Sequence, residues 1–229
     1  MPADSSATKA RILAAGERLF AESGFEAVSL RGVAREADVQ IALVHYHFGS
    51  KEGLYKAVWA QRYAGLADLR QARLPTVDFD RERVAVLRDL VDLFVTPLMA
   101  GPDAHRFLKI MAHEYADPRE PERGVVKAYI DPVTRQLLDA FRKALPGLAD
   151  ADVGWGYQAM TGALMMNVVD VDRATRLTGG AARSGDTKAA LPALREFIVG
   201  GWLALADRRQ AGGSAQDAAE GETRQALPE

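Results

Sequence analysis

The sequence contains no cysteine among its 229 residues. This absence excludes disulfides, thiolate catalysis and thiolate metal sites, and it fits a reducing compartment. The chain also lacks an excess of positive charge, because 29 Lys and Arg face 31 Asp and Glu for a formal net charge of −2. There is thus no global attraction to phosphate or to an anionic membrane. Any affinity for nucleic acid must come from local placement of charge.

Two features of exported and membrane-bound proteins are missing as well. The N-terminal stretch MPADSSATKARIL has no basic start followed by an apolar run, which a signal peptide requires. No apolar run in the sequence approaches the roughly 18 residues that span a bilayer. We therefore expect a cytoplasmic protein with no membrane contact.

The sequence also lacks the pattern of β-strands. No segment shows sustained period-two alternation bounded by hairpin turns. Apolar residues recur instead at spacings of three and four, which favours helices, so the expected fold class is all-α. The helices are predicted at about 8–23, 30–37, 40–47, from 51 onward, 83–100, 104–116, 124–144, 151–175 and 188–209.

A change in composition near the C-terminus suggests how the chain is divided. From residue 211 the sequence is small, polar and aperiodic, which is typical of disorder. We expect an N-terminal helix-turn-helix domain at 1–50, a helical effector-binding and dimerisation domain at 51–210, and a disordered tail at 211–229.

The expectation for the N-terminal domain rests on its short helices and their boundaries. Gly24 can supply the left-handed residue that ends the first helix, and Ser29 suits the N-cap of the second. A third short helix follows a turn at Asp38, and Ser50 then caps a long helix. Two short helices separated by a tight turn describe a helix-turn-helix.

Residues 8 to about 55 resemble the DNA-binding domain of the tetracycline-repressor (TetR) family of bacterial transcription regulators. The resemblance rests on three successive stretches, LFAESGFEAVSLRGVAREADV, IALVHYHF and GSKEGLY. It implies a helical C-terminal domain of variable sequence, and repression that a ligand relieves. The sequence departs from the family pattern at Asp38, where glycine is usual, and at His45, where tyrosine is common.

In such a unit the second helix of the motif lies in the major groove. Val39, Val44 and Phe48 are predicted to point inward and to hold this helix on the first two. The alternative is that 40–47 is merely a packed amphipathic helix. Base contacts are expected from Arg31, Gln40, Ile41, Ala42, Leu43 and His45. Phosphate contacts are expected from Thr8, Ser29, Tyr46, His47 and Lys51.

The C-terminal part carries no recognisable motif, but its helices are rich in methionine and aromatic residues. Such side chains form adaptable apolar cavities, so we expect a pocket for a small apolar effector. The alternative is that they are plain core. The predicted lining is Phe94, Phe107, Met111, Tyr115, Trp155, Met160, Met165 and Met166.

A single helix-turn-helix makes too few contacts for tight binding to an operator, so a homodimer on a palindrome is expected. The last two long helices suit the dimer interface, where they would form a four-helix bundle with their symmetry mates. The alternative is burial of these helices inside one subunit. The predicted interface residues are Gly156, Ala159, Ala163, Phe197, Ile198, Trp202 and Leu205.

The predicted function is thus a ligand-responsive regulator of transcription, with double-stranded DNA and a small molecule as partners and no cofactor. One rival is an enzyme that uses His105, His113, Glu114 or Asp117, although no nucleophile-base series or phosphate-binding glycine loop supports it. The two histidines match no compact metal-binding signature, so no metal site is predicted. A second rival is a dimeric adaptor that has lost DNA binding.

Overall fold

The structure is a computed structural model that describes residues 2–100, 104–169, 172–183 and 186–225, with side chains described within 5–208. Every regular element in these ranges is a helix, which confirms the all-α prediction. The longer helices are α1 (Pro2–Ala27), α2 (Leu30–Glu36), α3 (Ile41–Phe48), α4 (Lys51–Arg73), α5 (Arg83–Met99), α6 (Ala104–Ala116), α8 (Asp131–Ala144), α9 (Asp150–Val169) and α11 (Thr187–Gln225). The shorter ones are η1 (Leu74–Thr76), α7 (Glu120–Arg123), η2 (Val126–Ile130) and α10 (Arg173–Leu177).

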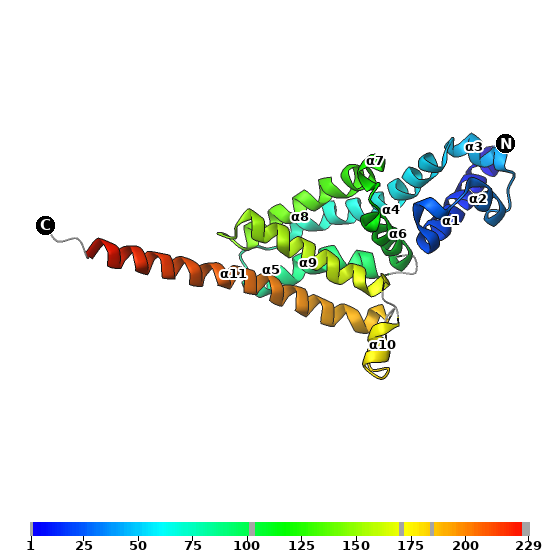
Figure 1. Ribbon diagram of the computed structural model, residues 1–229. Coiled ribbons are helices and arrows are strands. Elements are labelled where there is room, and N and C mark those ends of the chain that lie inside the picture. The colour runs from blue at the N-terminus through cyan, green and yellow to red at the C-terminus, as the bar shows by residue number, and fades with distance from the viewer. Residues whose placement is uncertain (1, 101–103, 170–171, 184–185, 226–229) are drawn as a thin grey trace.

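The helices form two parts that α4 joins (Figure 1). The first part consists of α1, α2 and α3, with α3 at one end of the molecule. The second part is a bundle of α5, α6, α8 and α9, and α11 lies beside α5 and α9 before it runs on past the bundle. The short N-terminal helices therefore stand at the end of the molecule, where a partner can reach them.

The helix α4 belongs to both parts. Near its start, Leu54 and Tyr55 are buried against α1, where Tyr55 packs edge-on against the ring of Phe20. Further along, Trp59 meets Phe107 of α6, and the Tyr63 hydroxyl donates to the carbonyl of residue 130. The boundary at residues 50 and 51 stays a prediction, because one helix packs into both cores.

The helix that begins at Pro2, rather than at residue 8, is interrupted at Gly24, whose φ and ψ are not helical. This confirms the predicted role of Gly24 as the residue that ends the first helical stretch, and a short helical piece to Ala27 follows the bend. Gly24 has φ 72°, a conformation that side chains with a Cβ rarely adopt. A Cβ at this position would lie 3.4 Å from Nδ1 of His113, so α6 packs closely against the bend. The bend places Phe25 next to Tyr55 of α4, with 5.0 Å between the ring centroids.

Two predicted helices are divided in the structure. The helix expected at 124–144 consists of the π-helical η2 followed by α8, which begins just before Pro132. Proline has no N–H and its ring crowds the carbonyl four residues earlier, which disfavours a regular α-helical turn at this point. The helix expected at 151–175 consists of α9 and part of α10, and residues 170–171 lie outside the described residues.

The helix α11 continues past residue 210 to Gln225. Residues 226–229 lie outside the described residues. The segment 211–225 contains Ala, Gln, Glu and Arg, which are good helix formers. The tail expected from 211 as disordered or only marginally helical stays a prediction.

The segment Thr187–Arg208 of α11 is long and apolar enough to cross a membrane by length and composition, with a mean hydropathy of 1.4. Two ion pairs fasten it to α5 instead. Arg195 Nε lies 2.5 Å from Asp92, and Arg88 is bonded to Glu196 through two nitrogens. Charges in the middle of the segment that pair with a neighbouring helix indicate a helix packed on the protein.

Trp202 of α11 is buried in the single chain. Its indole stacks on Phe141 at 4.3 Å between ring centroids, and it covers Gly156 of α9. Ile198 is buried on the same side of α11. Gly156, Ile198 and Trp202 thus pack within one subunit, and their predicted part in a dimer interface stays a prediction.

We predict that Gly156→Ala destabilises the protein. An added Cβ would lie 2.6 Å from the Trp202 ring, which is fixed by its stack on Phe141 and cannot move aside easily. The expected loss of unfolding free energy is about 1 to 3 kcal/mol, measured by chemical denaturation.

Gly154→Ala is the matched control on the same helix. A Cβ at this exposed position would meet nothing within 4 Å. Alanine should therefore leave the stability unchanged or raise it by up to about 1 kcal/mol. Equal effects of the two substitutions would show that the contact with Trp202 does not constrain α9.

Candidate nucleic-acid interface

The inner side of α3 is apolar and packs on the rest of the N-terminal part. Val44 is fully buried, and Val39 and Phe48 are partly buried against the same core. The predicted inward orientation of these three residues is confirmed. The other side of α3 is consequently turned to solvent.

The turn before α3 has the geometry that ends helices with a left-handed residue. Asp38 has φ 51°, and the N–H of Val39 donates to the carbonyl of Ala34 at 3.0 Å. These are the marks of a Schellman turn, in which glycine is usual and aspartate is tolerated. Nη2 of Arg11 donates to the Asp38 carbonyl at 2.9 Å and fixes the turn from α1. The predicted survival of this turn without glycine is confirmed.

The outer side of α3 carries most of the residues predicted to touch DNA. Tyr46 is the most open of them, with 78% of its surface exposed. Arg31 of α2 is exposed too, and it forms no ion pair with any described residue. Thr8 and His47 are half-buried, so they offer only part of their side chains. The exposed positions are Gln40, which precedes α3 as its N-cap, and Ile41, Ala42, Leu43, His45 and Tyr46 of α3.

His45 is oriented by a bond to its own backbone. Its Nδ1 lies 3.0 Å from the carbonyl oxygen of Gly49, which can only accept. Nδ1 must therefore be the donor in this bond, and in the tautomer with one proton Nε2 is an acceptor that points away from it. Such an acceptor suits the amino groups of adenine or cytosine in the major groove.

Two serines cap the helices on either side of α3. Ser29 Oγ accepts from the N–H of Gly32 at 3.1 Å, and Ser50 Oγ accepts from the N–H of Gly53 at 3.0 Å. Each hydroxyl retains a proton that can be donated to a phosphate oxygen. The free N–H groups and the dipole at the start of α4 favour an anion at the same place.

Sequence reasoning missed two residues that shape this interface, Arg11 and Gly53. A Cβ on Gly53 would lie 2.1 Å from the carbonyl oxygen of Phe48, so only glycine allows α3 and α4 to approach so closely. A glycine in the first turn of a helix, where it lowers stability, was the available signal for a close backbone contact. No sequence signal connects Arg11 with a carbonyl 27 residues away.

Lys51 is bonded within the chain, and the phosphate contact predicted for it stays a prediction. Its Nζ donates to the carbonyls of Phe25 and Glu26 at 2.9 and 3.2 Å, and it lies 4.3 Å from the centroid of the Phe25 ring. These carbonyls follow the bend at Gly24 and lack helical partners. Lys51 thus ties the start of α4 to the end of α1.

Two protein-family models match this chain. "Bacterial regulatory proteins, tetR family" matches residues 12–58, which contain α2, α3 and the start of α4. "Tetracyclin repressor-like, C-terminal domain" matches residues 92–201. The chain belongs to the TetR family. Members of this family are DNA-binding regulators of transcription rather than enzymes.

The TetR-family chain is similar over short segments to two curated regulators. It is 27% identical over 86 residues to "Probable HTH-type transcriptional regulator YttP" of Bacillus subtilis, a match that covers 38% of this chain and 42% of that protein. It is 31% identical over 61 residues to the HTH-type transcriptional regulator UidR of Escherichia coli K12, a match that covers 27% of this chain and 31% of that protein. The matches therefore span less than half of each relative's length.

Solved structures resemble the TetR-family chain over most of its length. The regulator HlyIIR has a TM-score of 0.54 at 20% identity, covering 79% of this chain and 98% of that one. FadR of Bacillus halodurans, a fatty acid degradation regulator, has a TM-score of 0.56 at 16% identity, and the match covers 85% of this chain and 95% of that one. A Saccharomonospora viridis protein in complex with choline has a TM-score of 0.57 at 20% identity, and the match covers 84% of this chain and 94% of that one. At such identities the likeness concerns the fold alone.

The eight residues predicted to line an effector pocket do not form one group in this TetR-family protein. Phe94, Phe107, Met111 and Met160 are buried, and Tyr115 and Met165 are partly buried. Trp155 and Met166 are exposed on α9, and Trp155 lines a surface hollow together with Met160. The predicted lining of an effector pocket stays a prediction.

A buried ionic cluster connects the helix-turn-helix with α6 and α7. The carboxylate of Glu114 accepts from the Tyr55 hydroxyl at 2.8 Å and from Nε of Arg123 at 3.0 Å. Arg123 also reaches Asp117 at 2.7 Å, and its guanidinium lies 4.9 Å from the centroid of the Phe25 ring. Burial and the charge of Glu114 raise the pKa of Tyr55, which keeps the hydroxyl protonated as a donor.

This cluster occupies two of the residues named for the rival enzyme. Glu114 and Asp117 are both bonded to Arg123, and His113 lies against the bend at Gly24. Burial and the nearby Lys109 lower the pKa of His105. No group of three or more metal-binding side chains is present within the described residues. The arrangement serves the contact between the two parts.

We predict that Lys51→Ala destabilises the protein by about 1 to 3 kcal/mol, because two hydrogen bonds and a cation-ring contact are lost. DNA affinity should fall on every duplex, since the start of α4 is no longer held. The salt dependence of binding should not change, whereas loss of a phosphate contact would lower its slope by about 0.9. Thermal unfolding and a salt titration of duplex binding measure both effects.

Lys56→Ala is the control, because Lys56 is exposed on the same helix and has no partner among the described residues. It should leave the melting temperature unchanged. An unchanged melting temperature in Lys51→Ala, together with a weaker salt dependence of duplex binding, would support a contact between Lys51 and a phosphate.

Proposed function

We propose that the protein is a repressor that binds a palindromic operator as a homodimer through α3, and that a small, largely apolar molecule releases it. One observation carries the proposal. The helix α3 is held from inside by Val44 while its outer side stays exposed at the end of the molecule (Figure 1). This is the arrangement that groove reading requires, and it counts against an adaptor that has lost DNA binding.

The contacts on the outer side fall into two kinds. Gln40 and Arg31 can read bases through paired hydrogen bonds, and Ile41 and Leu43 can meet thymine methyl groups. Ser29, Tyr46 and the start of α4 would contact phosphates and set the position on the duplex. Arg31 has no acidic partner among the described residues, so binding to DNA breaks no ion pair.

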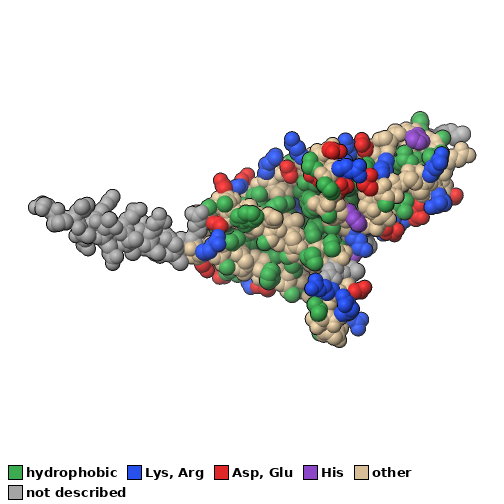
Figure 2. All heavy atoms as spheres, viewed as in Figure 1, with side chains coloured by type: hydrophobic (Ala, Val, Ile, Leu, Met, Phe, Trp, Pro, Cys, Tyr) green, Lys and Arg blue, Asp and Glu red, His purple; other side chains and the backbone are tan. Residues whose placement is uncertain are grey.

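The proposed dimer interface is the outer face of α9 and α11. Trp155 of α9 is 65% exposed and Phe197 of α11 is 75% exposed, and Met166 and Val169 add to the same apolar surface. Figure 2 shows hydrophobic side chains gathered over this face. Large exposed aromatic residues on neighbouring helices are typical of surfaces that a partner covers.

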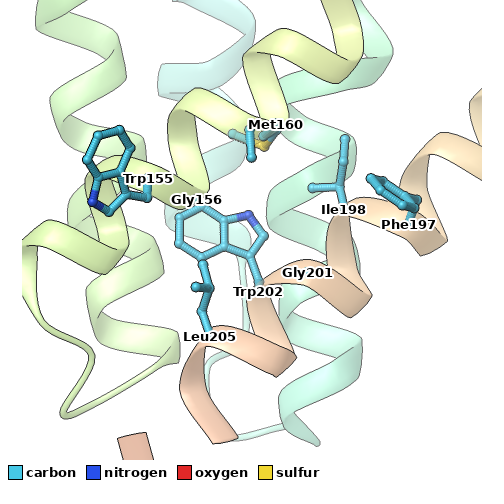
Figure 3. A pocket seen from close by; sticks show the side chains of 9 residues that line it. Trp155, Gly156, Met160, Phe197, Ile198, Gly201, Trp202 and Leu205 are labelled. Carbon is cyan, nitrogen blue, oxygen red and sulfur yellow. The ribbon is translucent and has the colours of Figure 1, made fainter. Parts of the chain in front are cut away.

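A hollow of about 340 Å³ lies between α9 and α11 on this face (Figure 3). Met160, Ile198 and Trp202 form its buried floor, while Ala159 and Gly201 are exposed at its edge. A second copy related by twofold symmetry would place its own Trp155 or Phe197 into such a hollow. Four helices, two from each subunit, would then bury the apolar surface.

The same face could instead be read as a membrane contact, and the charges around it argue for a second copy. The pairs of Asp92 with Arg195 and of Arg88 with Glu196 lie within the apolar segment of α11. In a bilayer these charges would lie in the hydrocarbon layer, which is costly. In a protein interface they can lie at the solvent-accessible edge, where charged side chains are common. We propose a protein that remains in the cytoplasm.

The effector acts in this proposal through α4. Its start is capped by Ser50 beside the operator, and its later turns lie in the C-terminal core. The bond from Tyr55 to Glu114 fixes α4 to α6 between these ends. A ligand that favours one position of α4 would change the separation of the two α3 helices, with a coupling of about 1 to 3 kcal/mol.

Selection of bound duplexes from a random pool tests the proposal directly. We expect enrichment of a palindrome whose half-sites lie about one helical turn, or a small multiple of it, apart. Enrichment without symmetry would contradict binding as a dimer. No enrichment at all would contradict the regulator and support the adaptor.

We predict that Gln40→Ala relaxes base preference at one position of each half-site, with a loss of discrimination of about 1 to 3 kcal/mol. Gln136→Ala is the matched control, since Gln136 is exposed on α8 in the C-terminal bundle. Competition binding with single-base variants of the selected operator measures the effect. An unchanged profile in Gln40→Ala would place the reading surface elsewhere.

We predict that Phe197→Glu converts the dimer to a monomer and weakens operator binding at least about tenfold, because a charge would be buried at the interface. Leu177→Glu is the control, since Leu177 is as exposed as Phe197 but lies on α10, outside this face. Sedimentation velocity gives the mass of each variant. A dimeric Phe197→Glu protein would rule out this face.

A further inference from the structure

A charged side chain without an acidic partner lies inside the C-terminal part. Arg70 of α4 is only 5% exposed. Its Nη2 donates to the carbonyl of Phe94 at 3.1 Å, and its guanidinium lies 5.1 Å from the centroid of the Phe94 ring. Nε is buried and has no hydrogen-bond partner. Arg70 forms no ion pair within the described residues.

Three tyrosines surround this guanidinium from different helices. Tyr63 lies two turns earlier on α4, Tyr115 on α6 and Tyr157 on α9, and the edge of Tyr157 meets the Phe94 ring at 6.1 Å between centroids. The hydroxyl of Tyr115 is buried, and no acceptor or donor lies in hydrogen-bond geometry with it, although Tyr157 is near enough to raise its pKa. The cluster therefore holds two unsatisfied polar groups, one of them on a cation.

The protonation states make the cluster a set of donors. Burial raises the pKa of Tyr63 to about 12, although Arg70 opposes the shift, and burial also raises the pKa of Tyr115. Burial lowers the pKa of Arg70, while the tyrosines oppose this change. Asp131, whose charge reaches both Tyr63 and Tyr115, is paired with Arg135 at 3.5 Å. The positive charge of Arg70 therefore has no counter-ion in contact with it among the described residues.

A purely structural role accounts for only part of this arrangement. The bond from Arg70 ends on the carbonyl of Phe94 in α5, three residues before Pro97. That role uses one of five N–H donors, and a neutral donor could fill it without burying a charge. It also leaves the unpaired hydroxyl of Tyr115 unexplained. Buried polar groups that lack partners in native proteins indicate a site that something else completes.

We infer that the effector carries a carboxylate, and that Arg70 binds this group with the hydroxyl of Tyr115 as a further donor. The inference rests on the proposed function, because it specifies the molecule that would release the operator. Phe94 and its neighbours offer an apolar wall for the remainder of the ligand.

The charge count favours a carboxylate over other groups. A carboxylate brings one negative charge and four lone-pair positions, which match one guanidinium and neighbouring hydroxyl donors. A phosphate dianion would leave a second charge unpaired in an apolar interior. A quaternary ammonium such as choline would be repelled by Arg70. The helix η2 also supports a ligand site near Arg70. It is a π-helical turn whose last carbonyl accepts from Tyr63, and such turns recur at functional sites.

The test uses the full chain without DNA and four acids as probes: benzoate, phenylacetate, hexanoate and octanoate. Each acid is compared with its primary amide, which has the same shape without the charge. We expect at least one acid to raise the melting temperature while its amide does not. Arg70→Gln should lower the affinity for that acid, measured by calorimetry, at least about 30-fold. Arg73→Gln removes an exposed charge one turn later and should bind the acid as tightly as the parent.

Two more variants separate binding from folding. Arg70→Lys keeps the charge but loses the fork geometry, so it should bind the acid more weakly than the parent and more tightly than Arg70→Gln. Tyr115→Phe removes a hydroxyl that has no partner, so the free protein should be as stable as the parent or more stable. Its affinity for the acid should nevertheless fall about three- to tenfold.

Each remaining outcome overturns the inference. It fails if none of the acids raises the melting temperature, if the amides act as well as the acids, or if Arg70 and Tyr115 variants bind like the parent. Gel shifts on the selected operator keep this result apart from the proposed function. A protein that binds its operator but ignores every acid refutes the carboxylate alone, whereas failure to bind any duplex refutes the regulator.

Discussion

The buried carboxylate of Glu114 holds the two parts of this molecule together. It receives a hydrogen bond from Tyr55 of α4 and a paired contact from Arg123, which in turn covers the ring of Phe25 beside the bend in α1. Lys51 lies against the same ring and binds the carbonyls that follow the bend. A hydrogen bond to a charged group is worth about 1.5 to 3 kcal/mol, so loss of the Tyr55 donor from this buried carboxylate opposes separation of the two parts.

This junction gives α4 a mechanical role that follows from its packing. The helix starts at a cap that faces the proposed phosphate site, passes the Glu114 junction, and ends near Arg70 in the interior. A change at either end must act on a helix that is fixed in its middle.

The two sides of α9 and α11 show how one apolar pair of helices serves two purposes. Gly156 and Trp202 interlock inside the subunit, because a glycine lets the indole lie against the backbone of α9. Trp155 and Phe197 point outward from the same helices and remain exposed. A purely apolar pattern hides this division, since both sides satisfy the same periodicity.

The sequence by itself determined the helical fold, the motif around α3 and the inward direction of Val39, Val44 and Phe48. Local patterns are enough for these features, because caps, turn residues and helical spacing act over a few residues. Only the tertiary structure decided that Lys51 turns inward, that Trp155 and Met166 lie outside, and that Arg70 is buried among tyrosines. Each of these depends on which distant helix packs nearby, and no local pattern encodes the neighbour that a side chain will meet.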